Sequence, residues 1–231
     1  MKTSWIWTFA LVAILMTSCQ KDDDSYSVGK FWVGFGIIDK SGPDSFTVQM
    51  DDGSIIHPVA GNLNGSWFED DQRVLVNYTI VSDKKVDETD KEYFVKINSA
   101  RKILMKGIVD ITEAIEDSIG NDPVIIRDAW MSSNQLLNME LRYFGNSEVH
   151  FINLVKEPGE LTAADQPIEL ELRHNKNGDR EDVLFNAFVS FDLSAIMIED
   201  QDSVSFIVRS VDYQGNESTF EGTYKYVIAT E

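Results

Sequence analysis

The chain has 231 residues, of which 39 are acidic and 20 are basic, so that its net charge at neutral pH is −19. Hydrophobic residues make up 43% of the chain, which excludes a wholly disordered protein and is enough for packed domains. The negative charge excludes a nucleic-acid-binding role, because such a protein neutralises phosphates with clustered lysine and arginine. Cys19 is the only cysteine, so the fold cannot rely on disulfides.

Residues 1–19 have the pattern of a secretion signal. Lys2 supplies a basic start, residues 5–16 form an apolar run interrupted only by Thr8, and small residues precede Cys19. Signal peptides combine these features, whereas a transmembrane helix needs about 20 apolar residues. The run Leu15-Met16-Thr17-Ser18-Cys19 resembles a bacterial lipoprotein processing site. We therefore expect a mature chain that begins at Cys19 and carries lipid there.

Charged residues follow this cysteine directly. Lys21, Asp22, Asp23 and Asp24 resemble the export signal of Bacteroidetes surface lipoproteins, in which a lysine and two or more acids follow the lipidated cysteine. The alternative is a solvated acidic spacer, as most charge runs are. We expect residues 20–30 to form a tether from an outer-membrane anchor to domains that face the cell exterior. The lipid on Cys19 would make the membrane contact alone, because anionic lipid repels the rest of the chain.

Residues 31–106 are predicted to form a small closed barrel of the OB type. The expected strands cover residues 31–39, 46–50, 55–57, 73–81 and 92–105. Gly34 and Gly36 would bend the first strand, and the Asp52-Gly53 pair predicts a hairpin between the second and third. Five strands with a bent first strand are typical of such barrels. The loop at 60–69 carries two glycines and two asparagines, so we do not expect the helix that closes many OB barrels there.

Residues 107–231 are predicted to form a β-sandwich. A short helix is expected over residues 110–120, with Asp110 as its cap. Strand patterns follow at Val124–Ser132, Gln135–Tyr143, Glu148–Val155, Ile168–Arg173, Val183–Asp192, Ser203–Tyr213 and Phe220–Val227. Their alternation of apolar and polar residues favours two packed sheets. The expected fold class is therefore all-β, an OB-like barrel followed by a sandwich. Residues 106–231 carry nine basic and 24 acidic side chains, a net charge of −15.

Four phrases of the chain resemble the NigD-like lipoproteins of Bacteroidetes. They are VQMDDG at 48–53, RVLVNYT at 73–79, DSIGNDPV at 117–124 and HFINLV at 150–155, in the expected order. The resemblance implies an OB-like N-terminal domain, a sandwich C-terminal domain and a lipid anchor. It also implies a link to bacteriocin immunity, the role suspected for the protein that gave the family its name. It supplies no catalytic residues.

The residues that could carry chemistry form no catalytic or metal motif. His57, His150 and His174 lack the spacing of zinc ligands, and no Gly-x-Ser-x-Gly elbow occurs. We therefore expect a non-enzymatic protein without a cofactor or a metal. The oxygen-bearing residues of 175–182 could form a weak calcium site, but a tight hairpin turn at Asn177-Gly178 explains them more simply.

Trp67 and Phe68 are the candidate ligand contacts, because they lie together in a polar loop after Gly65. In one interpretation this pair folds back to plug the open end of the barrel. In the other it stands out and binds a partner. The expected partner is an unidentified protein, with a glycan as the alternative. An exposed aromatic platform in a groove would favour the sugar, and an apolar patch with a polar rim would favour the protein.

Overall fold

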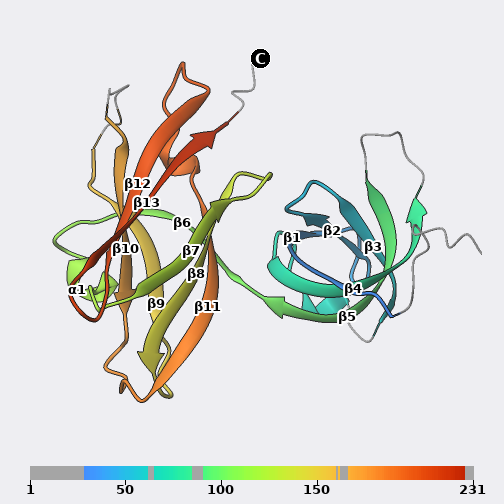
Figure 1. The fold of residues 1–231 in the computed structure, drawn as a ribbon. Helices are drawn as coiled ribbons and strands as arrows, with labels where there is room; N and C mark the ends of the chain where they lie inside the picture. The colour runs from blue at the N-terminus through green and yellow to red at the C-terminus, as the bar shows by residue number, and fades with distance from the viewer. Residues whose placement is uncertain (1–28, 62–64, 85–90, 160, 162–165, 227–231) are drawn as a thin grey trace, which may run out of the picture.

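The chain folds into two β domains, and a computed structural model describes residues 29–61, 65–84, 91–159, 161 and 166–226. Figure 1 shows a barrel from the first half of the chain beside a sandwich from the second half. The prediction of an all-β chain, with an OB-like barrel followed by a sandwich, is confirmed. Within the described part of the chain, no helix is long and apolar enough to span a membrane.

The barrel closes with the strand order β1-β2-β3-β5-β4. Its strands are β1 (Trp32–Lys40), β2 (Phe46–Met50), β3 (Ile55–Gly61), β4 (Arg73–Lys84) and β5 (Glu92–Lys102). The expected hairpin joins β2 to β3, where Gly53 has a φ of 82°, a conformation that glycine adopts without steric cost. β3 pairs with β5 in parallel, and the other neighbouring strands are antiparallel.

Aliphatic side chains fill the barrel, because alternate residues of each strand point inward. Ile38, Val48, Ile56, Val74 and Val95 are completely buried. A single 3-10 turn, η1 (Gly65–Trp67), lies between β3 and β4 in place of the helix found in many OB barrels.

One long strand expected at 92–105 is in fact two. β5 ends at Lys102, and β6 (Leu104–Asp110) leaves the barrel to join the sandwich. Leu104–Gly107 pair with β11, and Ile108–Asp110 pair with β9. Between them Ile103 is buried and its N–H donates to the Arg73 carbonyl over 2.9 Å. The strand pairing thus places residues 104–106 in the sandwich, three residues before the expected boundary.

The sandwich contains all seven expected strands. They are β7 (Ile125–Met131), β8 (Leu136–Gly145), β9 (Phe151–Lys156), β10 (Ile168–Asn175), β11 (Val183–Asp192), β12 (Ser203–Val211) and β13 (Glu217–Lys225). One layer is β7-β8-β11 and the other is β9-β10-β12-β13, with β6 shared between them in the order β13-β12-β10-β9-β6-β11-β8-β7. A 3-10 turn, η2 (Ser194–Ile196), follows β11 and is buried at Ile196.

The helix expected over 110–120 is mostly absent. Only α1 (Glu116–Ile119) forms, with Ile115 at its N-terminal cap and no side-chain cap hydrogen bond. Asp110, the expected cap, belongs to β6 instead. The isoleucine spacing has another cause, since Ile111 and Ile119 pack on Val155 in a small separate cluster.

A buried arginine joins the two domains. Arg73, the first residue of β4, is completely buried, and its terminal nitrogens bind both carboxylate oxygens of Asp51 over 2.5 and 2.6 Å. The same guanidinium donates to the sandwich, from Nε to Ser190 over 3.0 Å and from a terminal nitrogen to Asn138 over 2.8 Å. Ser190 in turn donates to Asn138.

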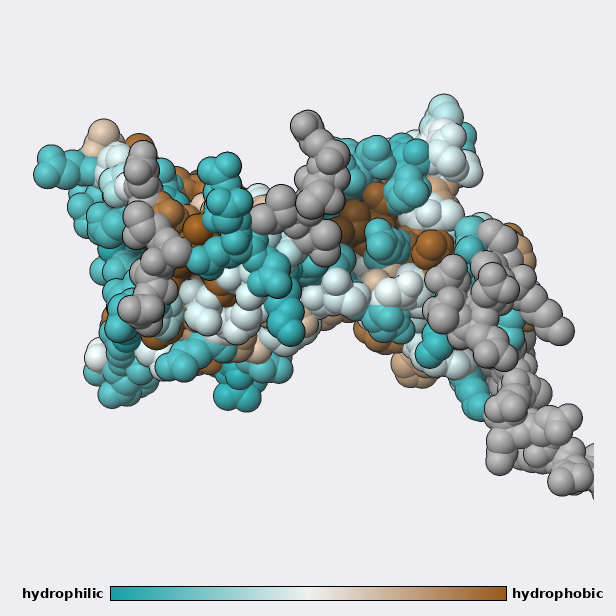
Figure 2. Space-filling view, turned by 90° about the horizontal axis from the view of Figure 1, so that it is seen from above, coloured by the Kyte–Doolittle hydropathy of each residue, from teal (hydrophilic) through white to brown (hydrophobic). Residues whose placement is uncertain are grey.

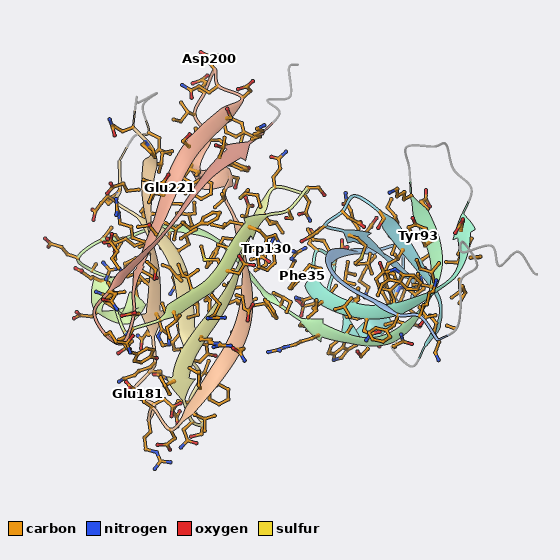
Figure 3. All side chains as sticks on the ribbon, in the orientation of Figure 1. Phe35, Tyr93, Trp130, Glu181, Asp200 and Glu221 are labelled. Atoms are coloured by element: carbon orange, nitrogen blue, oxygen red, sulfur yellow. The ribbon has the colours of Figure 1, made fainter. Side chains whose placement is uncertain are left out.

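Aromatic rings surround this arginine. The Phe35 ring lies 5.4 Å from the guanidinium carbon of Arg73. Figure 3 shows Phe35 of β1 close to Trp130 of β7, and the two ring centroids are 5.7 Å apart. Phe188 of β11 meets Phe35 edge-on at 5.2 Å. In Figure 2 the domains appear as two masses with a narrower waist between them. The joint is therefore filled by the Arg73 guanidinium and by aromatic rings from both domains.

Candidate functional site

The residues proposed for anchoring and export lie outside the described part of the chain. These are Cys19, Lys21, Asp22, Asp23 and Asp24. Lipidation and surface export therefore stay predictions of the sequence.

The structure separates the two candidate ligand contacts. Phe68 is only 3% exposed, and its ring lies 5.0 Å from Phe46 within the barrel core. Trp67 is 44% exposed and packs edge-on against Phe68 at 4.8 Å. The Lys102 ammonium sits over the indole, 5.1 Å from its centroid. Phe68 thus plugs the barrel end, while Trp67 lies outside with a cation already on its ring.

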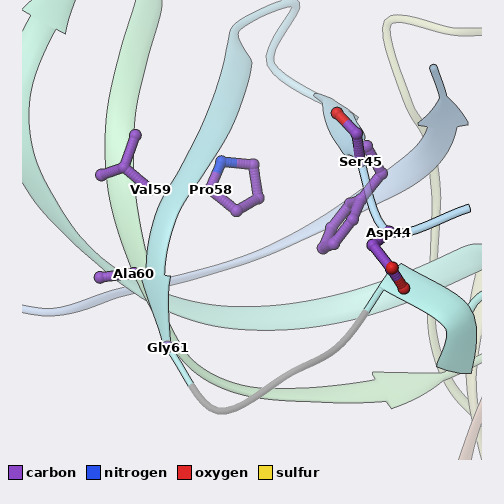
Figure 4. A pocket seen from close by; sticks show the side chains of 7 residues that line it. Asp44, Ser45, Pro58, Val59, Ala60 and Gly61 are labelled. Carbon is purple, nitrogen blue, oxygen red and sulfur yellow. The ribbon is translucent and has the colours of Figure 1, made fainter. Parts of the chain in front are cut away.

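A shallow cleft of about 280 Å³ lies near this end of the barrel (Figure 4). It opens where β2 and β3 diverge, since these strands pair only at Val48–Ile56 and Gln49–Ile55. Its lining is Asp44, Ser45, Phe46, Pro58, Val59, Ala60 and Gly61. Asp44 is the one charged group among them, so the cleft lacks the converging polar groups that orient a small ligand.

A buried chain of hydrogen bonds lies at one end of the sandwich, between its layers. His174 of β10 is completely buried, and its Nδ1 lies 2.9 Å from the Pro123 carbonyl oxygen. Its Nε2 is 2.8 Å from Nδ1 of His150, whose Nε2 is 3.1 Å from the Asp179 carboxylate. The Tyr143 ring of β8 stacks on His150 at 4.6 Å. We call His150, His174 and Asp179 the histidine array.

Glycine 145 makes room for this array. A Cβ at that position would lie 2.8 Å from Nε2 of His150 and 3.1 Å from the Asp179 carboxylate. Any larger residue would displace the ring or the carboxylate, because real Cβ contacts do not come so close.

The possible donors and acceptors limit how many hydrogen bonds the array can form at one time. The Pro123 carbonyl only accepts, so Nδ1 of His174 must carry a proton. Asp179, when ionised, also only accepts, so Nε2 of His150 must carry one as well. The contact between the rings needs one further proton between its two nitrogens. Two neutral rings hold only two ring protons between them, so with neutral rings at most two of these three contacts are hydrogen bonds at one time.

The surroundings shift the pKa values of two members of the array. Burial by itself would raise the pKa of Asp179, but hydrogen bonds from the Asn146 amide and from the His150 ring, together with the Ser147 and Arg180 amides, hold that pKa well below its ordinary value. The pKa of His174 is lowered, chiefly by burial, although its bond to the Pro123 carbonyl acts in the opposite direction. Burial therefore disfavours the charged form of His174.

The array also accounts for the acidic turn at 175–182. The Asp179 carboxylate faces His150 and backbone amides, so it is not an open cation ligand. Asn177 and Gly178 have φ values of 56° and 72°, as expected for a tight turn. The predicted hairpin is nevertheless wrong, because β10 and β11 belong to different layers and do not pair. Across the described residues, no three His, Cys, Asp or Glu side chains are grouped to hold a metal ion.

Exposed apolar side chains lie at the beginnings of two strands near the array, β9 and β11. Val183, Leu184 and Phe185 begin β11, and Val183 pairs with Gly145. Val149 and Phe151 flank His150 in sequence and are also exposed. The centroid of the Phe185 ring is 6.1 Å from that of Tyr143. We call Val149, Phe151, Val183, Leu184 and Phe185 the apical patch. Figure 3 places Glu181, two residues before β11, at the same end of the sandwich.

Sequence reasoning missed both the array and the patch. His150 opens one of the phrases that carry the family resemblance, and His174 ends a cleanly alternating strand. Neither signal reveals that β9 and β10 pair so that His174 lies opposite Ile152, two residues from His150.

Domain profiles match both halves of the chain. The profile of the NigD-like N-terminal OB domain matches residues 35–103, and that of the NigD-like C-terminal beta sandwich domain matches residues 107–224. A search of curated proteins finds no match.

Solved structures from Bacteroides and its relatives share the fold. A candidate toxin-related protein of Parabacteroides distasonis is 26% identical with a TM-score of 0.70, over 85% of this chain and 94% of that one. A NigD-like immunity protein of Bacteroides caccae is 19% identical, with a TM-score of 0.63 over 86% and 98% of the two chains. A candidate lipoprotein of Bacteroides fragilis is 11% identical, with a TM-score of 0.62 over 86% and 100%.

At 19% and 11% identity, the similarity to the last two structures shows the fold alone. The two domain profiles carry the family assignment, because they match adjacent segments in the expected order and the sandwich profile alone spans half of the chain. The chain belongs to the NigD-like family.

Proposed function

We propose that this protein is a lipid-anchored, surface-exposed binding module of the outer membrane, without catalytic activity, whose ligand is another protein. The apical patch is the observation that carries this proposal. Each of its five side chains is between 38% and 67% exposed, and they lie at or just before the first residues of β9 and β11 in one domain. Clustered exposed apolar residues rimmed by polar ones mark protein interaction sites on soluble domains. Glu148, Glu181 and Asn186, which lie close to these residues in the sequence, are exposed.

The order of the domains suits presentation from a membrane. β1 begins at Trp32 opposite Tyr78, whereas the joint lies five residues further along both strands, where Ile37 faces Arg73. The proposed tether of residues 20–30 would therefore join the barrel at a point away from the joint. Fully extended, it would span at most about 40 Å. The sandwich would then stand beyond the barrel, with its apical patch open to partners.

The related structures agree with a protein ligand. One is named a NigD-like immunity protein and another a candidate toxin-related protein. An immunity protein acts by binding, so a role linked to bacteriocin immunity would need no catalytic residue on this chain. We include such a role in the proposal by family analogy.

The alternative ligand is a glycan, and exposed Trp67 is the observation that favours it. Sugar rings stack on the open face of an aromatic side chain, but Lys102 already covers the indole ring. The neighbouring cleft offers only Asp44 as a charged group. The geometry therefore supports the protein ligand better.

Site-specific photocrosslinking in living cells tests the proposal. A photoreactive residue at Leu184 should give a crosslinked adduct with a protein, whereas one at Val81, an exposed apolar position on β4, should not. A glycan array probed with wild type and Trp67→Ala tests the alternative. Binding to sugars that is lost in Trp67→Ala, together with no protein adduct at Leu184, would replace the protein ligand by a glycan.

A further inference from the structure

The first half of β11 is an open strand edge. β8 pairs with all ten residues of β11 on one side, from Val183 to Asp192. On the other side β6 pairs only with Val189–Asp192. Nothing in the described part of the chain pairs with residues 183–188 on that side. Figure 1 shows this part of β11 as the free lower margin of the sandwich.

The opening arises from the path of β6. Its first residue, Leu104, already lies opposite Val189, and the chain before it belongs to the barrel. β6 then crosses to the other layer and pairs with β9 from Leu154 onward. The first residues of β9 are nevertheless covered, because the Lys106 ammonium donates to the Ile152 carbonyl over 3.0 Å and to Asn153 over 2.8 Å. β11 has no comparable cover.

The outermost strands of the sandwich are protected in the usual ways. β13 carries exposed Glu217, Glu221 and Lys225. β7 has exposed Arg127 and Asp128 and an irregular register between Ile126 and Asp128. Charged side chains and bulges discourage an edge from pairing with another chain.

The open segment of β11 has none of these features. Residues 183–188 read VLFNAF, without a charge, a proline or a register shift. Val183 and Phe185 alternate with Leu184, so both faces of the segment are apolar at the surface. A row of free backbone N–H and C=O groups is matched best by another extended backbone, and the side chains on both faces then select its sequence.

We propose that this edge binds an extended segment of the protein partner, which adds to the sheet as a strand beside β11. This inference deepens the proposed function and rests on its protein ligand. The free edge admits about six residues, because Leu104 of β6 closes it at Val189. Residues of the ligand that lie beside Val183, Leu184 and Phe185 should be apolar. The bound strand would continue the line of β6 along the edge of the layer.

A displayed library of random linear peptides tests the inference with purified protein. Selection on wild type should enrich peptides with apolar residues at the positions that meet Val183, Leu184 and Phe185. A variant with Val183→Lys and Leu184→Lys should bind the enriched peptides at least tenfold more weakly. Both side chains are exposed, so these changes should preserve the fold. Val211→Lys, at an exposed position of β12, serves as the matched control and should bind normally.

Backbone methylation of an enriched peptide then separates strand addition from side-chain contact. Alternate N–H groups of an added strand point toward β11, so N-methylation at one set of alternate positions should abolish binding and at the other set should be tolerated. Tolerance at both sets would overturn the inference. So would equal binding to the double lysine variant, or a library without any enriched peptide.

Crosslinking distinguishes this failure from failure of the proposed function. Protein adducts from another exposed position, with none from Leu184, would leave a protein-binding module that does not use the β11 edge. No protein adduct from any exposed position would remove the proposed function itself.

Discussion

Arg73 shows how one side chain can define the relation between two domains. It makes contacts on both sides of the joint, to Asp51 in the barrel and to Asn138 and Ser190 in the sandwich. A buried charge of this kind adds little net stability when it is paired, but removal of one partner leaves the other uncompensated. The two phrases at 48–53 and 73–79 that carry the family resemblance thus contain the two halves of this ion pair.

Replacement of Arg73 by methionine should lower the free energy of unfolding by about 3–5 kcal/mol, because it leaves the Asp51 carboxylate without the guanidinium that pairs with it. Urea denaturation of the full chain measures the change. Arg180→Met is the control, since the Arg180 side chain is 74% exposed beside Asp182. Surface pairs of this kind contribute less than about 1 kcal/mol. A loss of similar size in both variants would show that the joint does not depend on Arg73.

The histidine array should make stability depend on pH. The folded-state pKa of His174 is lowered by burial, so in mildly acidic solution the unfolded chain binds a proton that the folded chain excludes. Stability should therefore fall as the pH decreases through 6.5, the ordinary pKa of histidine. Asp179 adds a second loss at lower pH, below its ordinary pKa of 3.8, because its own pKa is lowered in the folded state.

Urea denaturation of wild type and His174→Gln between pH 7.5 and 5 measures the first effect. The groups around His174 are His150, Tyr143, Asp122 and the Pro123 carbonyl, and His150 links it to Asp179. The variant should lose part of the slope between pH 6.5 and 5. Identical slopes in both proteins would show that His174 accepts a proton equally well folded and unfolded.

At the scale of elements, the turn η1 replaces a plugging helix with one aromatic side chain. Phe68 is buried against Phe46, and exposed Trp67 only covers it from outside. Phe68→Ala should therefore cost about 3–5 kcal/mol of stability, as large-to-small changes in a core do. Trp67→Ala should cost about 1 kcal/mol or less, close to the range of surface changes. Urea denaturation of both variants measures these losses of stability. An equal loss would show that Trp67 and Phe68 close the barrel end together.

The strands were predictable because their side chains alternate. Ile168, Leu170 and Leu172 of β10 point to the core, with charged residues between them, and this period of two appears directly in the sequence. The turn at Gly53 was also predictable, because few dipeptides other than Asp-Gly fit it so well. Local patterns of this kind fix which segments are strands.

Which strands pair with one another could not be predicted from the sequence. No glycine or proline lies between residues 92 and 106, so the sequence contains no sign that the chain changes domains at Ile103. Asn177-Gly178 forms the expected turn, but it connects two layers. The array joins residues 24 positions apart, which only the register of β9 and β10 brings together. These features depend on long-range pairing, for which a single sequence carries no direct signal.

At the scale of the whole molecule, the stability of an isolated sandwich should depend on whether the fragment includes all of β6. A fragment of residues 107–231 lacks Leu104–Lys106, and so loses all of the pairing with β11 except that of Gly107, together with the bonds of Lys106 to β9. A fragment of residues 104–231 retains them. The longer fragment should unfold in one cooperative transition at a higher temperature, measured by circular dichroism. Equal melting temperatures would show that the first half of β6 does not stabilise the sandwich.

The proposed anchor has its own test. Cys19→Ala removes the only acyl acceptor, so the variant should leave the membrane fraction. Replacement of Asp22, Asp23 and Asp24 by alanine should keep the protein in that fraction but protect it from protease added to whole cells. A Cys19→Ala protein in the membrane pellet would refute the lipid anchor, and equal proteolysis of the aspartate variant would refute the export signal.

The position of β6 in the chain also determines the order in which the newly made chain can fold. Leu104 can pair only after Val189 has been synthesised, 85 residues later, and Ile108 only after Leu154, 46 residues later. At a synthesis rate of about 5–20 residues per second, the longer wait lasts about 4–17 s. The barrel, whose pairings all lie before residue 103, can close during that interval. During synthesis there is thus a stage in which the barrel is folded but β6 still lacks its partner strands. A chaperone would have its longest opportunity to bind at that stage.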